Sequence, residues 1–380
     1  MAHNPINPEQ RCFIKFVEHV YRKHLIAGPT MRKMREVFKA SVNEDLRLEN
    51  LTWCMEGDET SFSLHTLVRH IVVEGATKSL FGTHLHDIDH RVVEHMLDFN
   101  DNVWQLVMRY PDFPFYPSAV SAPLEKLLAI MRKFVAVPAR NYSQINLLIR
   151  HTLIGMENTA LDIDSRARMM LMMFWASVSN EHNSTFWLLT HILYDEELLQ
   201  LVEREVEEAW QSGDLDFRQL SEKCPNLDAA FHEVLRVKNA AGSMRMVNQE
   251  MTLGGKAIRP GNVIHIPFRQ LHTNENVWGD QALEFDHSRF LKQKSLTRNP
   301  SYKPFGGGES YCPGRTLAKH EVFTVVATLL HRFKVRLSGN GENRQPFPIM
   351  NDKTPSLGLN GPIDGMDIII NLCARKSFTA

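Results

Sequence analysis

The stretch "PFGGGESYCPGRTLAKHE", residues 304–321, carries the most specific signal in this sequence. Its three consecutive glycines, residues 306–308, leave the backbone free to bend sharply, because glycine has no Cβ. A lone cysteine, Cys312, follows, and the residues after Gly314 are typical of a helix. A thiol placed there lies near backbone N–H groups and the amino terminus of a helix, both of which favour its thiolate form.

The residues alone leave three interpretations of Cys312 open. Its thiolate could act as a nucleophile, or as an axial ligand to a haem iron, which is a flat group that a glycine-rich loop can approach closely. Phe305 would then shield the sulfur from water. The third interpretation is a buried, inert cysteine, which is the common case for a cysteine without such surroundings.

Composition limits the classes of function. The chain has 380 residues, 43% of them hydrophobic, which is enough for a large core. The formal net charge of −1 gives no electrostatic argument for a nucleic-acid partner. The five cysteines are odd in number and widely scattered, so the sequence predicts no disulfide framework and a reducing compartment; they are Cys12, Cys54, Cys224, Cys312 and Cys373.

The sequence gives little sign of a membrane segment. The first residues, "MAHNPINPEQ", lack the basic and apolar regions of a signal peptide. The most apolar run, Met169–Ala176, is far shorter than the roughly 20 residues that cross a bilayer. Residues 111–123 contain four prolines and several aromatic side chains, which predicts a loop. That loop either folds back onto its own domain or contacts a membrane or the path of a substrate.

Hydrophobic periodicity predicts a mainly α protein with small β-sheets. Asn226 is a plausible N-cap for the helix over 224–237. Residues 162–194 read as one buried helix of about 33 residues, at 1.5 Å per residue. The predicted helices span 8–26, 31–47, 87–109, 162–194, 196–210, 224–237 and 315–333, and β structure is predicted for 251–267 and for the end of the chain.

The middle of the long predicted helix is polar. The residues "SVSNEHNST" at 177–185 follow a strongly apolar segment. A polar patch in a buried helix is costly unless it is hydrogen-bonded or lines a cavity. The sequence therefore predicts either a functional site or a hydrogen-bonded kink there.

The cysteine loop resembles the haem-binding loop of the cytochrome P450 superfamily. The superfamily pattern F-G-x-G-x-x-x-C-x-G is met in full, by Phe305, Gly306, Gly308, Cys312 and Gly314. The resemblance implies haem b as cofactor, with its iron bound by the Cys312 thiolate. It also implies a cytochrome P450 fold in which residues 1–380 form a single domain.

Further motifs of the superfamily follow in its usual order. The pattern E-x-x-R occurs as Glu233 and Arg236, and "FDHSRF" resembles the segment that adds Arg289 to this pair. An i,i+3 ion pair alone proves nothing, because such pairs are common on solvated helices. In the superfamily the pair is buried and structural. Arg245 stands where the superfamily has a partner for a haem propionate, the alternative being an ordinary surface arginine. Ser310 replaces an arginine that many members use for the same purpose.

The central helix departs from the usual monooxygenase pattern of an acid followed by an alcohol. Ser179 stands at the acid position and Asn180 at the alcohol position, while Glu181 comes one residue late. The stretch "FWASVSNEHNSTFWLL" resembles the branch that contains prostacyclin synthase and the sterol hydroxylases. In that branch the asparagine faces the haem, which makes Asn180 the candidate catalytic residue. The alternative is that Asn180 only bends the helix.

The resemblance implies a haem-thiolate monooxygenase that oxidises a hydrophobic small molecule, of secondary-metabolite, terpenoid or sterol-like kind. Its electrons would come from a separate NADPH-dependent flavoprotein reductase. The missing acid–alcohol pair leaves a peroxide isomerase or dehydratase as the alternative.

The match begins late in the superfamily pattern, which predicts an amino-terminally truncated chain without the membrane anchor and first elements. An inactive scaffold is therefore a third possibility. Full-length members reside at the endoplasmic reticulum membrane, and this chain is expected to be soluble or peripheral.

Overall fold

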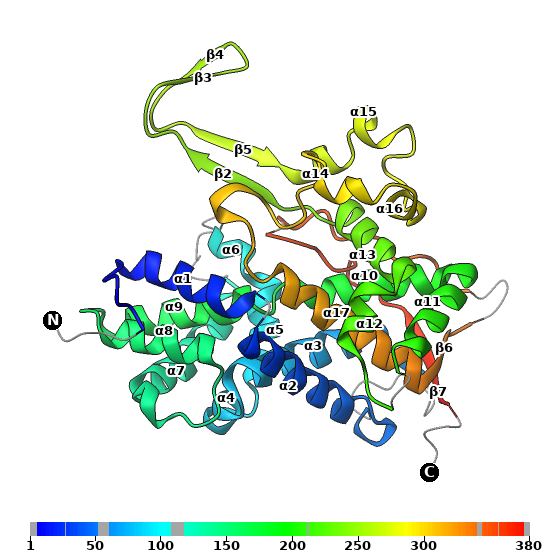
Figure 1. The fold of residues 1–380 in the computed structure, drawn as a ribbon, viewed down its shortest axis with the longest axis horizontal. Helices are drawn as coiled ribbons and strands as arrows, with labels where there is room; N and C mark the ends of the chain where they lie inside the picture. Colours follow the sequence, from blue (N-terminus) through cyan, green and yellow to red (C-terminus); the bar gives the residue numbers. More distant parts are fainter. Residues whose placement is uncertain are drawn as a thin grey trace. The chain divides into compact units, whose positions relative to one another are not determined.

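The structure is a computed structural model (Figure 1). It describes residues 6–26, 28–51, 61–107, 118–210, 213–339, 344–355 and 357–375. Two compact units divide the chain: the first comprises 1–186, 313–346 and 367–380, and the second comprises 187–312 and 347–366. The expectation of a single domain over 1–380 remains a prediction.

The first unit is built mainly of helices with one apolar face. In α1, Phe16 and Val20 are buried while Ile14 faces solvent, which confirms the amphipathic helix expected there. The helices of this unit are α1 (Phe13–Leu25), α2 (Pro29–Asp45), α3 (Leu64–Phe81), α4 (His84–Ile88), α5 (Val92–Asn102), α6 (Trp104–Val107), α7 (Ser121–Ala136), α8 (Leu147–Glu157), α9 (Ile163–Ala176) and α17 (Arg315–Arg332), with 3-10 turns at Leu48–Asn50 and Ala139–Asn141.

Close packing of α1 on α8 depends on one glycine. A Cβ placed on Gly155 would lie only 2.3 Å from a ring carbon of Phe16. The Phe16 ring is 2% exposed and therefore fills the space that a side chain at 155 would occupy. A larger residue at 155 would separate the two helices, because cores are packed at nearly crystalline density.

A three-stranded antiparallel sheet completes the first unit. Its strands are β1 (Ser61–Ser63), β6 (Phe333–Leu337) and β7 (Ile369–Ala374), in the order β1-β7-β6. Phe62 pairs with Ile370, and Val335 pairs with Leu372. Because β6 directly follows α17 and β7 lies near the end of the chain, the predicted terminal β region is confirmed.

The prediction of one helix over 162–194 is wrong. α9 ends at Ala176, residues 177–180 form turns, and α10 (Glu181–Tyr194) begins a new helix. The Ser177 hydroxyl donates to the Met173 carbonyl at 2.8 Å, and the Val178 N–H bonds three residues back, to Trp175. This local bonding competes with the α-helical ladder and ends the helix.

The burial expected all around the first half of this segment is also incorrect. Leu171 and Phe174 are buried, but Met172 is 63% exposed on the opposite side of α9. α9 is therefore a one-sided surface helix rather than a helix enclosed by the core.

The second unit contains α11 (Glu196–Glu208), α12 (Phe217–Glu222), α13 (Pro225–Val237), α14 (Phe268–His272), α15 (Glu275–Trp278), α16 (Ser288–Lys292) and 3-10 turns at Lys294–Arg298 and Gly308–Ser310. A small core cluster includes Trp278, Phe290 and Tyr302. The residue before α13 is Cys224, with Pro225 in the first turn.

Asn226 is therefore not the N-cap of α13, contrary to expectation. Its side chain instead donates to the Glu205 carboxylate at 2.6 Å. Proline suits the first helical position because its fixed φ fits the helix and its missing N–H would have no partner there.

The strands of the second unit form two antiparallel pairs. β2 (Gly242–Met246) pairs with β5 (Val263–Pro267), and β3 (Met251–Leu253) pairs with β4 (Lys256–Ile258) through a turn at Gly254–Gly255. These strands agree with the β structure predicted for 251–267, and Figure 1 shows β3 and β4 as the tip of one long hairpin.

Among the residues that the structure describes, no helix is both long and apolar enough to cross a membrane. Most of the proline-rich segment 111–123 falls on residues 111–117, outside the described residues. Its role in membrane contact therefore stays a prediction.

Candidate functional site

A closed backbone loop presents Cys312. Gly306 and Gly308 have φ values of 75° and 66°, in the left-handed region that favours glycine. The Cys312 N–H donates to the Phe305 carbonyl at 3.0 Å, and the Tyr311 N–H donates to the Gly308 carbonyl at 3.2 Å. These bonds draw Cys312 back toward Phe305, as the glycine pattern predicts.

The surroundings of Cys312 are compatible with an axial ligand to haem. Cys312 is half-buried and is not in a disulfide. A Cβ built on Gly308 would meet no atom within 4 Å, so the outer side of the loop is open. Gly314 caps α17, which begins at Arg315. A single soft thiolate on an open glycine loop fits haem iron better than a harder metal.

The base of the loop is fixed by buried polar groups. The Asn239 side chain donates to the Pro304 carbonyl at 2.9 Å, and the Lys303 N–H donates to Nε2 of His272 at 2.8 Å. Burial lowers the pKa of His272 to about 4, so its ring is neutral and able to accept this bond. The loop is therefore anchored independently of any ligand.

The side chains of two α13 residues, Glu233 and Arg236, meet the side chain of Arg289. Both side chains of the Glu233–Arg236 pair are 0% exposed, with nitrogen–oxygen distances of 2.7 and 2.8 Å in a two-pronged contact. The Arg289 Nε lies 3.3 Å from the same Glu233 carboxylate. The buried Glu233 carboxylate thus joins α13 to the segment that contains Arg289, which lies 53 or more positions further along the sequence.

The remaining donors of the two arginines bind backbone carbonyls. Arg236 donates to the carbonyls of His272, Ala282 and Glu284. Arg289 donates to those of Trp278 and Gln281, each at 2.7 Å. With its donors occupied in this way, the cluster is a cross-link between loops.

Arg245 lies exposed on β2, where Nη1 donates to the Ser243 hydroxyl at 2.6 Å and to the Met244 carbonyl at 2.9 Å. Its role toward a haem propionate remains a prediction. The side chain of Ser310 lies outside the described residues.

Asn180 lies in the turn between α9 and α10. Its side-chain amide donates to the Ser179 hydroxyl at 2.9 Å, and its backbone carbonyl accepts from the Ser184 hydroxyl at 3.1 Å. The polar patch is therefore satisfied at least in part by local bonds, as the kink interpretation expects. Asn180 belongs to the first unit and Cys312 to the second, and its catalytic role remains a prediction.

Two acidic residues in the first unit received no role from the sequence. Glu321 on α17 is 2% exposed, and its Oε2 has no hydrogen-bond partner among the described residues. Burial raises the pKa of Glu321 well above its usual range, and the charge of Glu181 adds to the rise. Burial likewise raises the pKa of Glu181 to about 7, although two backbone N–H groups oppose the shift.

The sequence contained a signal for Glu321. Leu317 lies four residues before it on the same helix face, and both side chains are buried. A glutamate on the apolar face of a helix indicates a strained or functional carboxyl group.

Replacing Glu321 with glutamine is expected to stabilise the protein at pH 8. The folded-state pKa values of Glu181 and Glu321 lie above the unfolded value of 4.5, so folding favours their protonated forms. The free energy of unfolding therefore falls as pH rises above about 4.5, because the two carboxyl groups ionise in the unfolded chain but stay protonated in the folded protein, Glu181 up to about pH 7 and Glu321 well above its usual range. Urea unfolding at pH 5 and pH 8 should show E321Q about 1–3 kcal/mol more stable than the parent at pH 8.

At pH 5 the difference should be much smaller, because the parent carboxyl is already neutral. Glu250, an exposed residue between β2 and β3, supplies the matched control E250Q, which should leave both values unchanged. Equal free energies of unfolding for E321Q and the parent at pH 8 would contradict the claim that the buried Glu321 carboxyl group destabilises the fold at this pH.

Comparisons with known proteins agree with this geometry. The family model described as "Cytochrome P450" matches residues 21–357. A cytochrome P450 monooxygenase of Gibberella zeae is 28% identical over 45% of this chain and 36% of its own length. Cytochrome P450 7A1 of Sus scrofa is 24% identical over 90% of this chain and 71% of its own length.

The cholesterol 7-alpha-monooxygenase of Cricetulus griseus is 23% identical over 96% of this chain and 77% of its own length. The chain thus spans about a third of one of these relatives and about three quarters of two others. The family match covers most of the chain, includes the Cys312 loop and contains the Glu233–Arg236 pair. This chain belongs to the cytochrome P450 family.

Proposed function

We propose that this protein is a haem-thiolate monooxygenase that oxidises a hydrophobic small molecule. The observation that carries the proposal is the Cys312 loop, closed by two left-handed glycines and open on its outer side. Haem bound there would supply activation of dioxygen and insertion of one oxygen atom into a C–H bond. Cys312 would hold the iron as a thiolate.

The other loop residues would orient and protect the sulfur. Phe305 accepts the Cys312 N–H through its carbonyl, so its ring is attached at the base of the turn. Gly306 and Gly308 provide the bend, and Gly314 lets α17 begin directly behind the cysteine. A helix amino terminus favours a negative charge, which would help to keep Cys312 ionised.

The Glu233–Arg236–Arg289 cluster would keep this loop in register with the rest of its unit. Arg236 binds the His272 carbonyl, and the His272 ring accepts the N–H of Lys303 at the base of the loop. The cluster is therefore one residue removed from the loop. Its proposed role is positioning rather than contact with the reacting atoms.

Asn180 is the proposed polar contact for an oxygen atom of the substrate. The support is its position at the start of α10, where the helix ladder is interrupted and its side chain is not buried in the core. Arg245, on the exposed face of β2, is the proposed partner for a haem propionate. A guanidinium suits this role because it binds carboxylates through two parallel bonds.

The proposed substrate is sterol-like or terpenoid, and the proposed electron donor is an NADPH-dependent flavoprotein reductase. Support for the substrate class comes from one relative, the cholesterol 7-alpha-monooxygenase of Cricetulus griseus, which matches 96% of this chain. A second candidate, a peroxide isomerase, is favoured by one observation: Ser179 and Asn180 occupy the positions of the usual acid and alcohol.

A single reconstitution experiment tests these functions. The full chain would be purified with haem, its haem content measured as the pyridine haemochrome, and turnover followed with reductase present. A monooxygenase should bind about one haem per chain and consume NADPH and dioxygen together with a hydrophobic substrate. Turnover of a lipid peroxide without NADPH would instead identify the isomerase. Absence of bound haem would reject both functions.

A further inference from the structure

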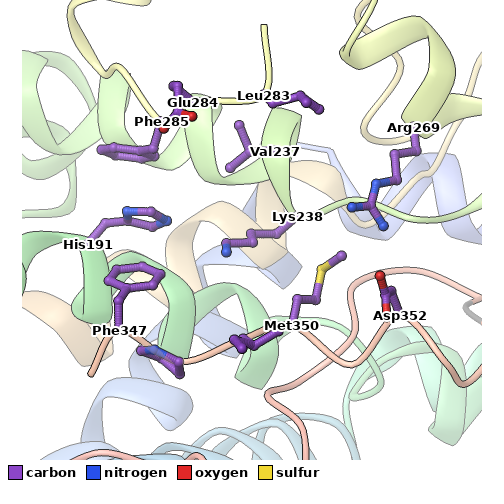
Figure 2. A pocket seen from close by; sticks show the side chains of 12 residues that line it. His191, Val237, Lys238, Arg269, Leu283, Glu284, Phe285, Phe347, Met350 and Asp352 are labelled. Atoms are coloured by element: carbon purple, nitrogen blue, oxygen red, sulfur yellow. The ribbon is translucent and has the colours of Figure 1, made fainter. Parts of the chain in front are cut away.

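The second unit contains a cavity of about 510 Å³ that is not lined by Cys312. Its walls come from the end of α10, the end of α13, the start of α14 and the segments 283–285 and 347–352 (Figure 2). This volume is sufficient for a small organic molecule, since ligand pockets usually measure about 300–1,000 Å³.

Two cationic side chains, Lys238 and Arg269, line this cavity. Figure 2 shows Lys238 directed toward His191 and Phe347, and the Arg269 guanidinium extending into the same space. Within the described residues, neither side chain has an ion pair or a hydrogen bond to its charged group. Burial, and after it the charge of Arg269, lower the pKa of Lys238 to about 8. Two cations that repel each other at a cavity are an arrangement that a bound anion would relieve.

The inner end of the cavity is aromatic. The Lys238 Nζ lies 3.9 Å from the centre of the Trp187 ring and 5.3 Å from that of Phe347. His191 stacks on Phe285 with ring centres 3.8 Å apart. These contacts hold the ammonium in place by cation–π attraction and leave flat apolar surface beside it.

His191 supplies a further unsatisfied group. Its Nε2 is buried and has no hydrogen-bond partner among the described residues. Burial lowers the pKa of His191 well below its usual range, with the charge of Lys238 as the second cause. The ring is therefore neutral and can donate one hydrogen bond to a ligand.

Acidic residues limit the kind of anion that fits. Glu284 and Asp352 also line the cavity, and both are exposed at its rim. They would repel a doubly charged phosphate more strongly than a singly charged carboxylate. A planar carboxylate also matches the guanidinium of Arg269, and an apolar body attached to it would lie against the aromatic end.

We propose that this cavity is a binding site for an apolar carboxylic acid, whose carboxylate lies between Lys238 and Arg269 and whose body packs against Phe285 and Phe347. The site goes beyond the proposed oxidation at Cys312, because it requires neither haem nor a reductase. It assigns to Lys238 and Arg269 the function of recognising negative charge.

Calorimetric titration of the full chain with 2-naphthoate tests the proposal. Its neutral amide, 2-naphthamide, has the same shape without the charge, and we expect it to bind at least tenfold more weakly. The K238M variant removes the ammonium but keeps the length of the side chain, and should weaken 2-naphthoate binding at least tenfold. The R269Q variant should weaken it to a similar extent, and provides a second test if K238M does not fold.

Lys256 on β4 gives the matched control, because it is exposed and lies outside the cavity. K256M should bind 2-naphthoate as the parent does. Equal affinity for the acid and its amide, or equal binding by K238M and K256M, would overturn the proposal. Binding of inorganic phosphate in preference to 2-naphthoate would overturn it as well.

The affinity should also depend on pH. The groups that face Lys238 are Arg269 and His191, with Glu284 and Asp352 at the rim. Raising the pH from 7 to 9.5 should weaken 2-naphthoate binding in the parent, because Lys238 loses its proton in this range. K238M should show much less of this change, and the same pH dependence in both proteins would contradict the assignment.

Discussion

Replacement of Cys312 by serine is expected to abolish the red-shifted absorption of the reduced carbon monoxide complex. That absorption requires a thiolate ligand to the iron, and a serine hydroxyl supplies no comparable soft anion at neutral pH. The loop itself should survive, because the backbone bond from residue 312 to the Phe305 carbonyl does not involve the side chain. The expected effect is complete loss of the signature with little change in the free energy of unfolding.

The control for C312S is C373S. Cys373 is exposed on β7, so serine there should leave the spectrum of the parent intact. Haem content should be measured in both variants, because haem lost from C312S and haem retained without the thiolate signature are equally consistent with the ligand role. A C312S protein whose carbon monoxide complex absorbs as the parent does would show that Cys312 is not the ligand.

The parts of the site that were predictable from sequence are those set by local chemistry. The glycines at 306 and 308 predict a left-handed bend, and the structure has positive φ at both. The pair Glu233 and Arg236 lies one helical turn apart, so its contact follows from helix geometry alone. Its complete burial was expected only from the resemblance.

Features that depend on several weak local choices were not predictable. The segment 162–194 has a helical pattern throughout, yet hydrogen bonds near Ser177 end α9 and place Asn180 in a turn. Each alternative hydrogen bond is worth only about 1 kcal/mol, so a continuous helix and a broken helix differ little in free energy in the isolated segment. Packing of the two halves decides between them.

Electrostatic coupling between residues far apart in the sequence is the second kind of feature that could not be predicted. Glu181 and Glu321 are 140 positions apart, and only the packing of α10 and α17 within the first unit lets one charge act on the other. Lys238 and Arg269 come together on one cavity in the same way. In both cases groups of like charge act on each other across a long stretch of sequence, which no spacing rule reveals.

Replacement of Arg236 by leucine should prevent the chain from folding stably. The change leaves the Glu233 carboxylate buried, with Arg289, at 3.3 Å, as its remaining cationic contact among the described residues. It also removes the donor from the carbonyls of His272, Ala282 and Glu284. Breaking a buried ion pair costs about 3–5 kcal/mol, and each buried carbonyl without a donor adds about 1–3 kcal/mol. Because domains are stable by only about 5–15 kcal/mol, R236L should accumulate as insoluble protein.

Yield of soluble protein and urea unfolding measure this effect. R236K keeps the positive charge but loses the planar fork, so it should fall between the parent and R236L. The double variant E233L/R236L removes both charges and should recover part of the loss, because an apolar pair avoids the uncompensated carboxylate. R298L, at an exposed arginine in the 3-10 turn Lys294–Arg298, should behave as the parent. Soluble R236L with the unfolding midpoint of the parent would mean that the cluster is not the cross-link that joins α13 to the loop beneath Cys312.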